Sequence, residues 1–191
     1  MKRIHRGFTL IELMVTISIG ATLMLIATPT LISYRRNADL TSTANTLVSS
    51  VNAARGEALK RGLSAMVVPI SNGSNWNAGW IVFVDVDSNR TYNPAIDTLV
   101  FTQTALPTTL NMVGNGVASG ATPAIIFDSS GYPKTRAGGF GAATLSITRT
   151  DTTSTTDPSQ TRNIVIALTG RTRVCTPRTA VDSECASTST F

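Results

Sequence analysis

Two arginines near the C-terminal end of the chain carry the strongest chemical signal in the sequence. They occur in the string Gly170-Arg171-Thr172-Arg173, directly after an apolar run at 164–168. In an extended segment, residues two apart point to the same side, so the two guanidinium groups would lie next to each other. Guanidinium groups bind phosphates through bidentate hydrogen bonds, and Gly170 leaves room for a close approach. The spacing therefore favours salt-sensitive, sequence-independent contact with the phosphates of a nucleic acid.

Other basic residues could extend this arginine pair. Seven lysines and arginines lie between positions 134 and 178, and only two aspartates oppose them. The candidates for additional phosphate contacts are Lys134, Arg136, Arg162 and Arg178. Two alternatives stay open: a positive face that only keeps the protein soluble, or ion pairs of Arg171 and Arg173 with Asp182 and Glu184.

The chain has two cysteines, Cys175 and Cys185, and both follow the arginine pair. A disulfide between them would close a short loop and contribute about 2 to 3 kcal/mol to stability. It would also hold the segment after the arginines rigid, which lowers the ordering cost of binding. Two free thiols are the alternative. A metal site at the two cysteines is disfavoured because the chain has only one histidine, His5, that could act as a further ligand.

An acidic turn follows another apolar run. Asp85, Asp87 and Asn89 match the start of an EF-hand loop, and a further aspartate follows at position 97. However, the sixth loop position is Arg90 where the loop needs glycine, and the twelfth is Ile96 where it needs a bidentate glutamate. Asp and Asn are also common turn residues. The sequence therefore favours a hairpin turn, predicts no metal or other cofactor, and leaves calcium as an alternative.

Composition argues against an enzyme. Beyond His5 there is no histidine to serve as a general base, and no serine or threonine has the context of a catalytic nucleophile. With 191 residues, the chain can form one helical stem and one modest domain. Its net charge is +5, and it falls to +2 if the basic residues before Gly7 are removed.

The N-terminal region has a single acidic residue at the start of an apolar run. Glu12 precedes Leu13–Ile32, which carries no charge and spans about 30 Å as a helix. A carboxylate is costly in lipid, so Glu12 is expected to have a partner. Basic residues before the run predict a cytoplasmic N-terminus. A cleaved secretory signal is the alternative, but the run is long and no small-residue cleavage site follows it.

One long helix and a set of strands must position these groups. Apolar residues recur at helical spacing beyond the membrane segment, and Gly62 is a suitable C-terminal cap. The predicted buried face of this helix consists of Leu40, Ala44, Leu47, Val48, Val51, Ala54, Ala58 and Leu59. Seven strands are predicted at 65–70, 80–84, 98–101, 110–113, 124–127, 144–148 and 163–168. This pattern predicts an α+β fold with the helix packed on antiparallel sheets.

The string Gly7-Phe8-Thr9-Leu10-Ile11-Glu12 with its apolar run resembles the prepilin signal of type IV pilins and pseudopilins. The resemblance implies that a prepilin peptidase cleaves after Gly7 and methylates Phe8. It also implies that Glu12 meets the freed amino group of a neighbouring subunit in the filament, a pairing that makes a buried charge tolerable. The expected parts are a leader at 1–7, a transmembrane and filament-core helix at 8–33, its amphipathic half at 34–62, and a β-domain at 63–191.

The later part of the chain resembles the FimT/GspH branch of minor pilins and pseudopilins. Gly79-Trp80-Ile81-Val82-Phe83 before an Asp/Asn-rich turn is typical of that branch. A Gly-Arg-x-Arg motif marks FimT-type minor pilins, and here it is intact at Gly170, Arg171 and Arg173. The resemblance implies a minor pilin that is anchored in the inner membrane with a periplasmic domain, then carried outside the cell in the pilus, and that binds double-stranded DNA for natural transformation. A structural minor pilin that primes pilus assembly and a GspH-like pseudopilin of type II secretion are the alternatives.

Overall fold

A computed structural model describes residues 7–70, 73–151, 158–179, 182 and 185, and at 26–30 it describes the backbone alone. The chain divides into two compact units, Met1–Ala38 and Asp39–Phe191. Helix α1 (Leu10–Arg61) runs through both. In the first unit the apolar side chains are exposed, with Leu25 at 78%. Within the described residues, no helix combines the length and the apolar character that a membrane span requires.

The second unit uses one stripe of α1 as part of its core. The fully buried helix residues are Leu40, Ala44, Leu47, Val51, Ala54 and Ala58, each at most 1% exposed. They recur at intervals of three and four, which confirms most of the predicted apolar face. The prediction was wrong for Leu59, which is 53% exposed because it lies on the last turn, at the edge of the stripe. The helix ends as expected at Gly62, which has a positive φ of 67° and donates its N–H to the Ala58 carbonyl.

Two antiparallel sheets follow the helix. The first has the strand order β3-β2-β1-β5-β6, and the second has the order β4-β7-β8-β9. The strands of the first sheet are β1 (Ser64–Pro69), β2 (Trp80–Asp85), β3 (Thr98–Gln103), β5 (Ile125–Phe127) and β6 (Pro133–Lys134). The strands of the second are β4 (Leu110–Gly116), β7 (Ala143–Arg149), β8 (Thr161–Ile166) and β9 (Thr172–Cys175). Short 3-10 helices lie at Trp76–Ala78 and Pro158–Gln160.

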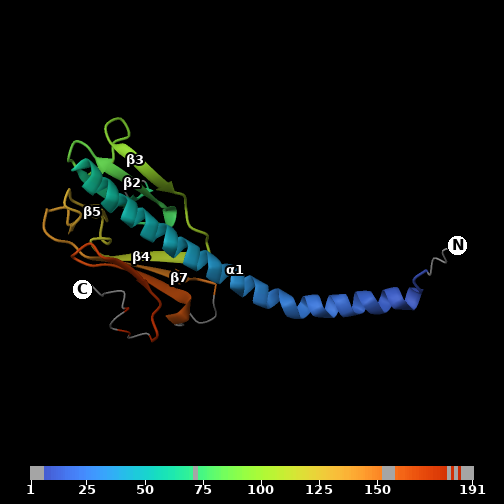
Figure 1. Cartoon of the computed structure of the whole chain (residues 1–191). Helices are drawn as coiled ribbons and strands as arrows, with labels where there is room; N and C mark the ends of the chain where they lie inside the picture. Colours follow the sequence, from blue (N-terminus) through green and yellow to red (C-terminus); the bar gives the residue numbers. More distant parts are fainter. Residues whose placement is uncertain (1–6, 71–72, 152–157, 180–181, 183–184, 186–191) are drawn as a thin grey trace. The chain divides into compact units, whose positions relative to one another are not determined.

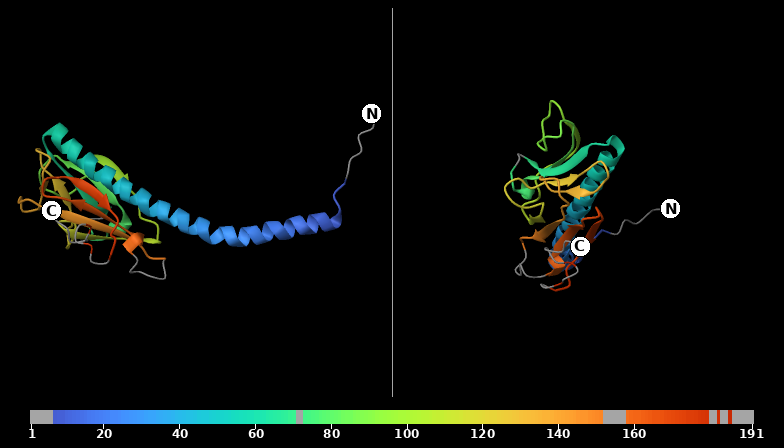
Figure 2. Two further views of the ribbon diagram at one scale, coloured as in Figure 1. Left: turned by 60° about the horizontal axis from the view of Figure 1, so that its bottom comes forward. Right: turned by 90° about the vertical axis from the view of Figure 1, so that its left-hand side faces the viewer.

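Both sheets pack on the same length of helix, as Figures 1 and 2 show for α1 with β2 and β7. One hydrophobic cluster contains the helix stripe, Trp80 and Val82 of the first sheet, and Leu145 and Ile164 of the second. The indole N–H of Trp80 donates to the Ser50 hydroxyl of α1 at 2.9 Å, so the polar atom of this buried ring has a partner. The α+β architecture of a long helix on antiparallel sheets is therefore confirmed.

All seven predicted strands are present, but two further strands were missed. β6 is only two residues long and begins with Pro133, which cannot donate a ladder hydrogen bond. β9 is only four residues long, Thr172–Cys175, and has no alternation of polar and apolar residues that would predict a strand. Its pairing with β8 extends the second sheet. The arginine motif thus belongs partly to a regular strand.

Candidate functional site

The arginine motif lies in the β8–β9 hairpin. In this hairpin, the Ala167 N–H donates to the Arg171 carbonyl at 3.0 Å, and the Gly170 N–H donates to the Ala167 carbonyl at 2.8 Å. Gly170 has a φ of 79°, a conformation that glycine adopts without steric cost. A tight turn that closes with a residue of positive φ is a common three-residue hairpin connection. Gly170 is therefore required by the turn itself.

The pairing register sets the direction of the two arginines. Val165 pairs with Arg173, and the next residues outward in the same register are Ala167 and Arg171. Side chains two residues apart lie on the same face of a strand, so Arg171 and Arg173 share one face of the hairpin. Arg171 is exposed, whereas Arg173 is half-buried. The hairpin thus places one exposed arginine next to a second that is half-buried.

A residue of α1 supports the hairpin turn. Arg55 Nη1 donates to the Gly170 carbonyl oxygen at 3.1 Å, and the Arg55 Nε is buried without a hydrogen-bond partner among the described residues. A Cβ added at Gly170 would lie 2.7 Å from the Gly131 carbonyl oxygen and 3.2 Å from Arg55 Cζ. Only glycine fits between these groups. Arg55 could not be predicted as a support of this turn, because in the sequence it is only a basic residue beside the apolar stripe of the helix.

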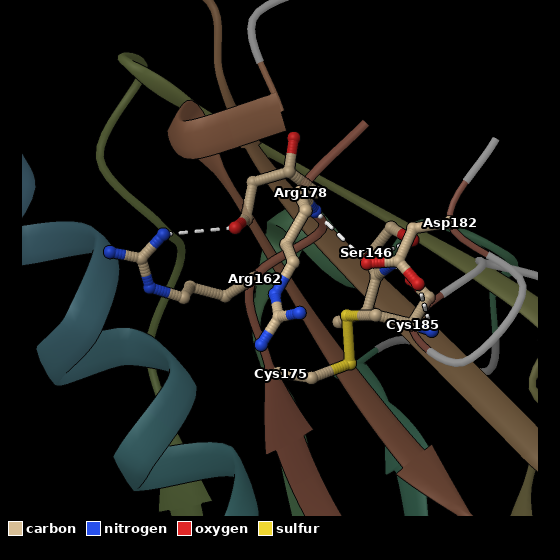
Figure 3. Close-up of a disulfide and its surroundings, with 8 residues drawn as sticks. Ser146, Arg162, Cys175, Arg178, Asp182 and Cys185 are labelled. Atoms are coloured by element: carbon tan, nitrogen blue, oxygen red, sulfur yellow. Dashed lines mark hydrogen bonds between the residues drawn. A yellow bond between two sulfur atoms is a disulfide. The ribbon is translucent and has the colours of Figure 1, made fainter. Parts of the chain in front are cut away.

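The predicted disulfide is present and fastens the end of β9. The two sulfur atoms of Cys175 and Cys185 are bonded, and their Cα atoms are 5.8 Å apart. Asn163 of β8 donates to the Cys185 carbonyl and accepts a hydrogen bond of 2.6 Å from the Ser146 hydroxyl of β7. Figure 3 shows the disulfide between Cys175 and Cys185 together with Ser146. Three strands therefore hold the segment that carries Cys185.

Asp182, one of the two acidic residues considered as partners of the arginines, lies in the disulfide loop. Its two carboxylate oxygens accept hydrogen bonds from the backbone N–H groups of Arg178 at 3.0 Å and Cys185 at 3.3 Å (Figure 3). Glu184 lies outside the described residues. With the residues that the structure describes, no ion pair to Arg171 is present. Asp182 serves as a local cap of the disulfide loop.

The other predicted basic residues divide between the two sheets. Lys134 lies on β6, pairs with Asp128 at 3.4 Å and stands 3.8 Å above the Phe140 ring centre. Arg136 donates to the carbonyl oxygens of Thr122 and Arg90, and burial together with the charge of Arg90 lowers the pKa of its guanidinium. Lys134 belongs to the first sheet and Arg136 to the turn after β6, so neither is part of the β8–β9 hairpin.

Arg162 and Arg178 lie on the second sheet and just after it. Arg162 of β8 is half-buried, and its guanidinium donates to the carbonyl oxygens of Ser159 and Thr161. Burial lowers the pKa of Arg162 from its ordinary value. Arg178 is exposed and follows β9 (Figure 3). Arg178 is the better placed of the two for contact with a large anion.

The acidic turn of the first sheet forms a compact cluster. Carboxylate oxygens of Asp85, Asp87 and Asp97 all lie within 4.8 Å of one another, and Asp85 and Asp97 are buried. Burial raises the pKa of Asp85, and the neighbouring Asp97 and Asp87 raise it further, against the Arg90 N–H that donates to this carboxylate. Asn89 is exposed and donates from both its backbone and side-chain nitrogens to Asp87.

The N-terminal residues of the predicted processing site are exposed. Gly7 and Phe8 precede α1, and Glu12 lies in its first turn. The Glu12 backbone N–H donates to the Thr9 hydroxyl at 3.3 Å. Thr9 and Glu12 thus occupy the positions of a capping box at the start of the helix. The leader residues 1–6 lie outside the described part.

Comparison with known protein families identifies the family to which the chain belongs. Residues 43–170 match the family described as type II transport protein GspH, which is more than half of the chain. The chain belongs to the GspH family. Residues 2–28 also match the prokaryotic N-terminal methylation motif, which includes Gly7, Phe8 and Glu12. The GspH match ends at Gly170, so Arg171, Arg173 and the disulfide lie beyond it.

Individual relatives agree with this assignment. The pilin-like protein PilA1 of Thermus thermophilus is 36% identical over 90 residues, which cover 47% of this chain. The matched region spans about half, 54%, of that relative. The structure of the type IV minor pilin FimU of Pseudomonas aeruginosa has a TM-score of 0.54 at 16% identity, over 77% of this chain and 98% of that one. The structure of the minor pseudopilin EpsH of Vibrio cholerae has a TM-score of 0.50 at 15% identity, over 73% of this chain and 98% of that one. Both show the fold that this GspH-family chain adopts.

Proposed function

We propose that this GspH-family protein is a minor pilin of a type IV pilus and that it binds double-stranded DNA for uptake. One observation carries the proposal: the β8–β9 hairpin presents Arg171 and Arg173 on one face, with Arg171 exposed. The turn is supported by Arg55 through Gly170, and the end of β9 by the disulfide. A hairpin held at both ends loses little freedom on binding, so more of the contact energy remains as affinity.

The chemistry of the hairpin fits the backbone of DNA better than its bases. Guanidinium groups bind phosphate oxygens in bidentate fashion, and Arg178 could add a third positive charge. Such contacts release counterions, so the affinity should fall steeply with salt and depend little on sequence. A site of two or three arginines is weak alone. Several subunits or other pilins in one filament would supply avidity.

The N-terminal region would deliver this domain to the cell surface. In the proposal, the prepilin peptidase cleaves after Gly7 and methylates Phe8, as the methylation-motif match supports. The apolar part of α1 then anchors the protein in the inner membrane with its domain in the periplasm, and later enters the filament beside other pilins. Glu12 would pair with the amino group of a neighbouring Phe8 there. We infer no catalytic role for any residue.

A DNA gel-shift assay of the full chain in non-ionic detergent tests the binding step. The wild type should shift double-stranded DNA at low salt, and the shift should weaken at physiological salt. Arg171→Ala with Arg173→Ala should abolish it. The control, Lys60→Ala with Arg61→Ala, removes the same charge from the end of α1 and should bind normally. Absence of binding by the wild type at low salt, with its fold checked by circular dichroism, would refute the DNA proposal.

A pseudopilin of type II secretion is the second candidate, because the family match and the fold of EpsH support it equally well. A structural minor pilin that primes assembly is the third. Deletion of the gene distinguishes the pseudopilin from the two minor-pilin roles, since loss of exoprotein secretion indicates a pseudopilin. The double arginine variant separates the other two: loss of DNA uptake with normal piliation supports the proposal, whereas loss of piliation supports the structural role.

A further inference from the structure

The β2–β3 connection gathers three carboxylates, and none of them forms an ion pair within the described residues. Asp85 ends β2, Asp87 lies in the loop, and Asp97 comes directly before β3. Their carboxylate oxygens lie within 4.8 Å of one another. Like charges this close repel, and the charge of Arg136, which acts on Asp85, offsets this repulsion only in part.

One oxygen of this cluster is buried and has no partner. Asp85 is 0% exposed, and its Oδ1 accepts no hydrogen bond from any described residue. Its other oxygen, Oδ2, accepts one from the Arg90 N–H at 3.0 Å. A buried carboxylate oxygen normally has a donor or a cation as its partner. Asp85 therefore keeps a buried oxygen that is available to coordinate a cation.

The nearby arginines do not donate to this oxygen. The Arg90 and Arg136 guanidinium groups each donate to the backbone carbonyl of the other residue. Arg136 also donates to the Thr122 carbonyl at 2.9 Å. These bonds join the acidic loop to the segment after β6. They leave the three carboxylates facing one another.

We propose that Asp85, Asp87 and Asp97 bind one calcium ion. Calcium takes six to eight oxygen ligands in irregular geometry, and water can complete a set begun by three carboxylates. The oxygens of Asp97 accept backbone hydrogen bonds from Val86 and Asn93, which fix the position of this carboxylate. A carboxylate oxygen has two lone pairs, so one that accepts a hydrogen bond can still coordinate a metal.

The fold explains how calcium can bind although the loop is no EF-hand. Arg90 has a positive φ of 60° in the position that an EF-hand gives to glycine, so the backbone makes the turn without it. The third carboxylate comes from Asp97 at the base of β3, which replaces the glutamate that the twelfth position lacks. The expectation of a simple hairpin turn rested on spacing along the chain, and the sheet brings the two ends of the loop together.

Thermal unfolding of the full chain in non-ionic detergent, with chelator or with added calcium chloride, tests the proposal. Saturating calcium should raise the Tm of the wild type by about 5 °C or more. Asp87→Asn should lose most of this shift, because it removes an exposed ligand with little effect on packing. The control Asp39→Asn, which changes an exposed aspartate of α1, should keep the full shift.

A second variant keeps the test independent of folding defects. Asp85→Asn should lose the calcium shift and yet be at least as stable as the wild type in chelator, because it removes a charge from the cluster. Isothermal titration with calcium chloride should give one site per wild-type chain. No shift and no binding heat at millimolar calcium would overturn the proposal. An equal shift with magnesium, or with sodium chloride at the same ionic strength, would overturn it as well.

Discussion

The β8–β9 hairpin and the β2–β3 loop both follow an apolar strand, yet the hairpin exposes a charged side chain and the loop buries two. The hairpin places Arg171 outward, and its turn is held by Arg55 from α1. The loop turns Asp85 and Asp97 inward, where both are buried beside Asp87. Exposed charge costs the fold little and stays available to a partner of any size. Buried like charge has a structural cost, which a small ion inside the loop would offset.

This difference predicts different kinds of partner. A flexible, exposed guanidinium suits a long polyanion that approaches from solvent, as proposed for DNA. A compact group of three carboxylates, two of them buried, suits a small cation, as proposed for calcium. The two connections should therefore respond to separate changes.

The largest expected effect comes from the disulfide. Cys175→Ser with Cys185→Ser should lower the free energy of unfolding by about 2 to 3 kcal/mol, because the loop regains its freedom in the unfolded chain. It should also weaken DNA binding, and it should leave the calcium-dependent Tm shift unchanged. Denaturant titration measures the stability. A reductant should destabilise the wild type and have no effect on the double variant; equal stability of the two proteins would contradict the prediction.

A smaller effect is expected for Gly170→Ala, at about 2 kcal/mol. Alanine has a cost at a positive φ, and its Cβ would also lie 2.7 Å from the Gly131 carbonyl oxygen. Gly120→Ala is the matched control, because Gly120 has a φ of 92° with nothing within 4 Å of the added Cβ. It should cost about 1 kcal/mol, for the backbone alone. Equal losses in the two variants would show that the close approach at Gly170 has no effect.

The sequence predicted the helix, seven of the nine strands and the disulfide, because each follows from local periodicity or from the cysteine count. The sequence could not predict contacts between segments that are far apart along the chain. Arg55 lies more than a hundred positions before Gly170, and nothing local relates the two. Lys134 and Arg136 share the positive charge of the arginine pair, and the sequence gives no other reason to group them with it. The sheet order instead assigns them to β6 and the segment after it, where other groups bind them.

The acidic loop is the clearest case of what spacing alone leaves out. A contiguous EF-hand loop is excluded by Arg90 and Ile96 at its sixth and twelfth positions. The antiparallel pairing of β2 with β3 then brings Asp97 back to Asp85. Burial of an unpartnered oxygen is a property of the packed structure, so no sequence pattern could reveal it.

The salt dependence of DNA binding sharpens the comparison further. Arg171→Ala should reduce the slope of log K against log salt by about 1, which corresponds to one phosphate contact. Arg171→Lys should keep the slope but bind more weakly, because lysine cannot make the bidentate contact. Lys60→Ala, which removes an exposed charge from α1, should change neither quantity. A reduced slope for Lys60→Ala would mean that DNA contacts the domain elsewhere.

The smallest expected effect concerns Asp128, an aspartate whose environment is the reverse of that of Asp85. Burial pushes its pKa up, but the N–H groups of Tyr132 and Ser130 and the Lys134 ammonium bring it below its ordinary value. A carboxylate with a lowered pKa stabilises the fold above the pKa it has in the unfolded chain, and this stability disappears as the pH falls through the folded-state pKa. Asp128→Asn should therefore cost about 1 kcal/mol at neutral pH and nothing at strongly acidic pH. Denaturation of both proteins at several pH values measures the difference. A cost that persists in acid would assign the role of Asp128 to neutral hydrogen bonding, and the contrast with the repelling charges around Asp85 would then fail.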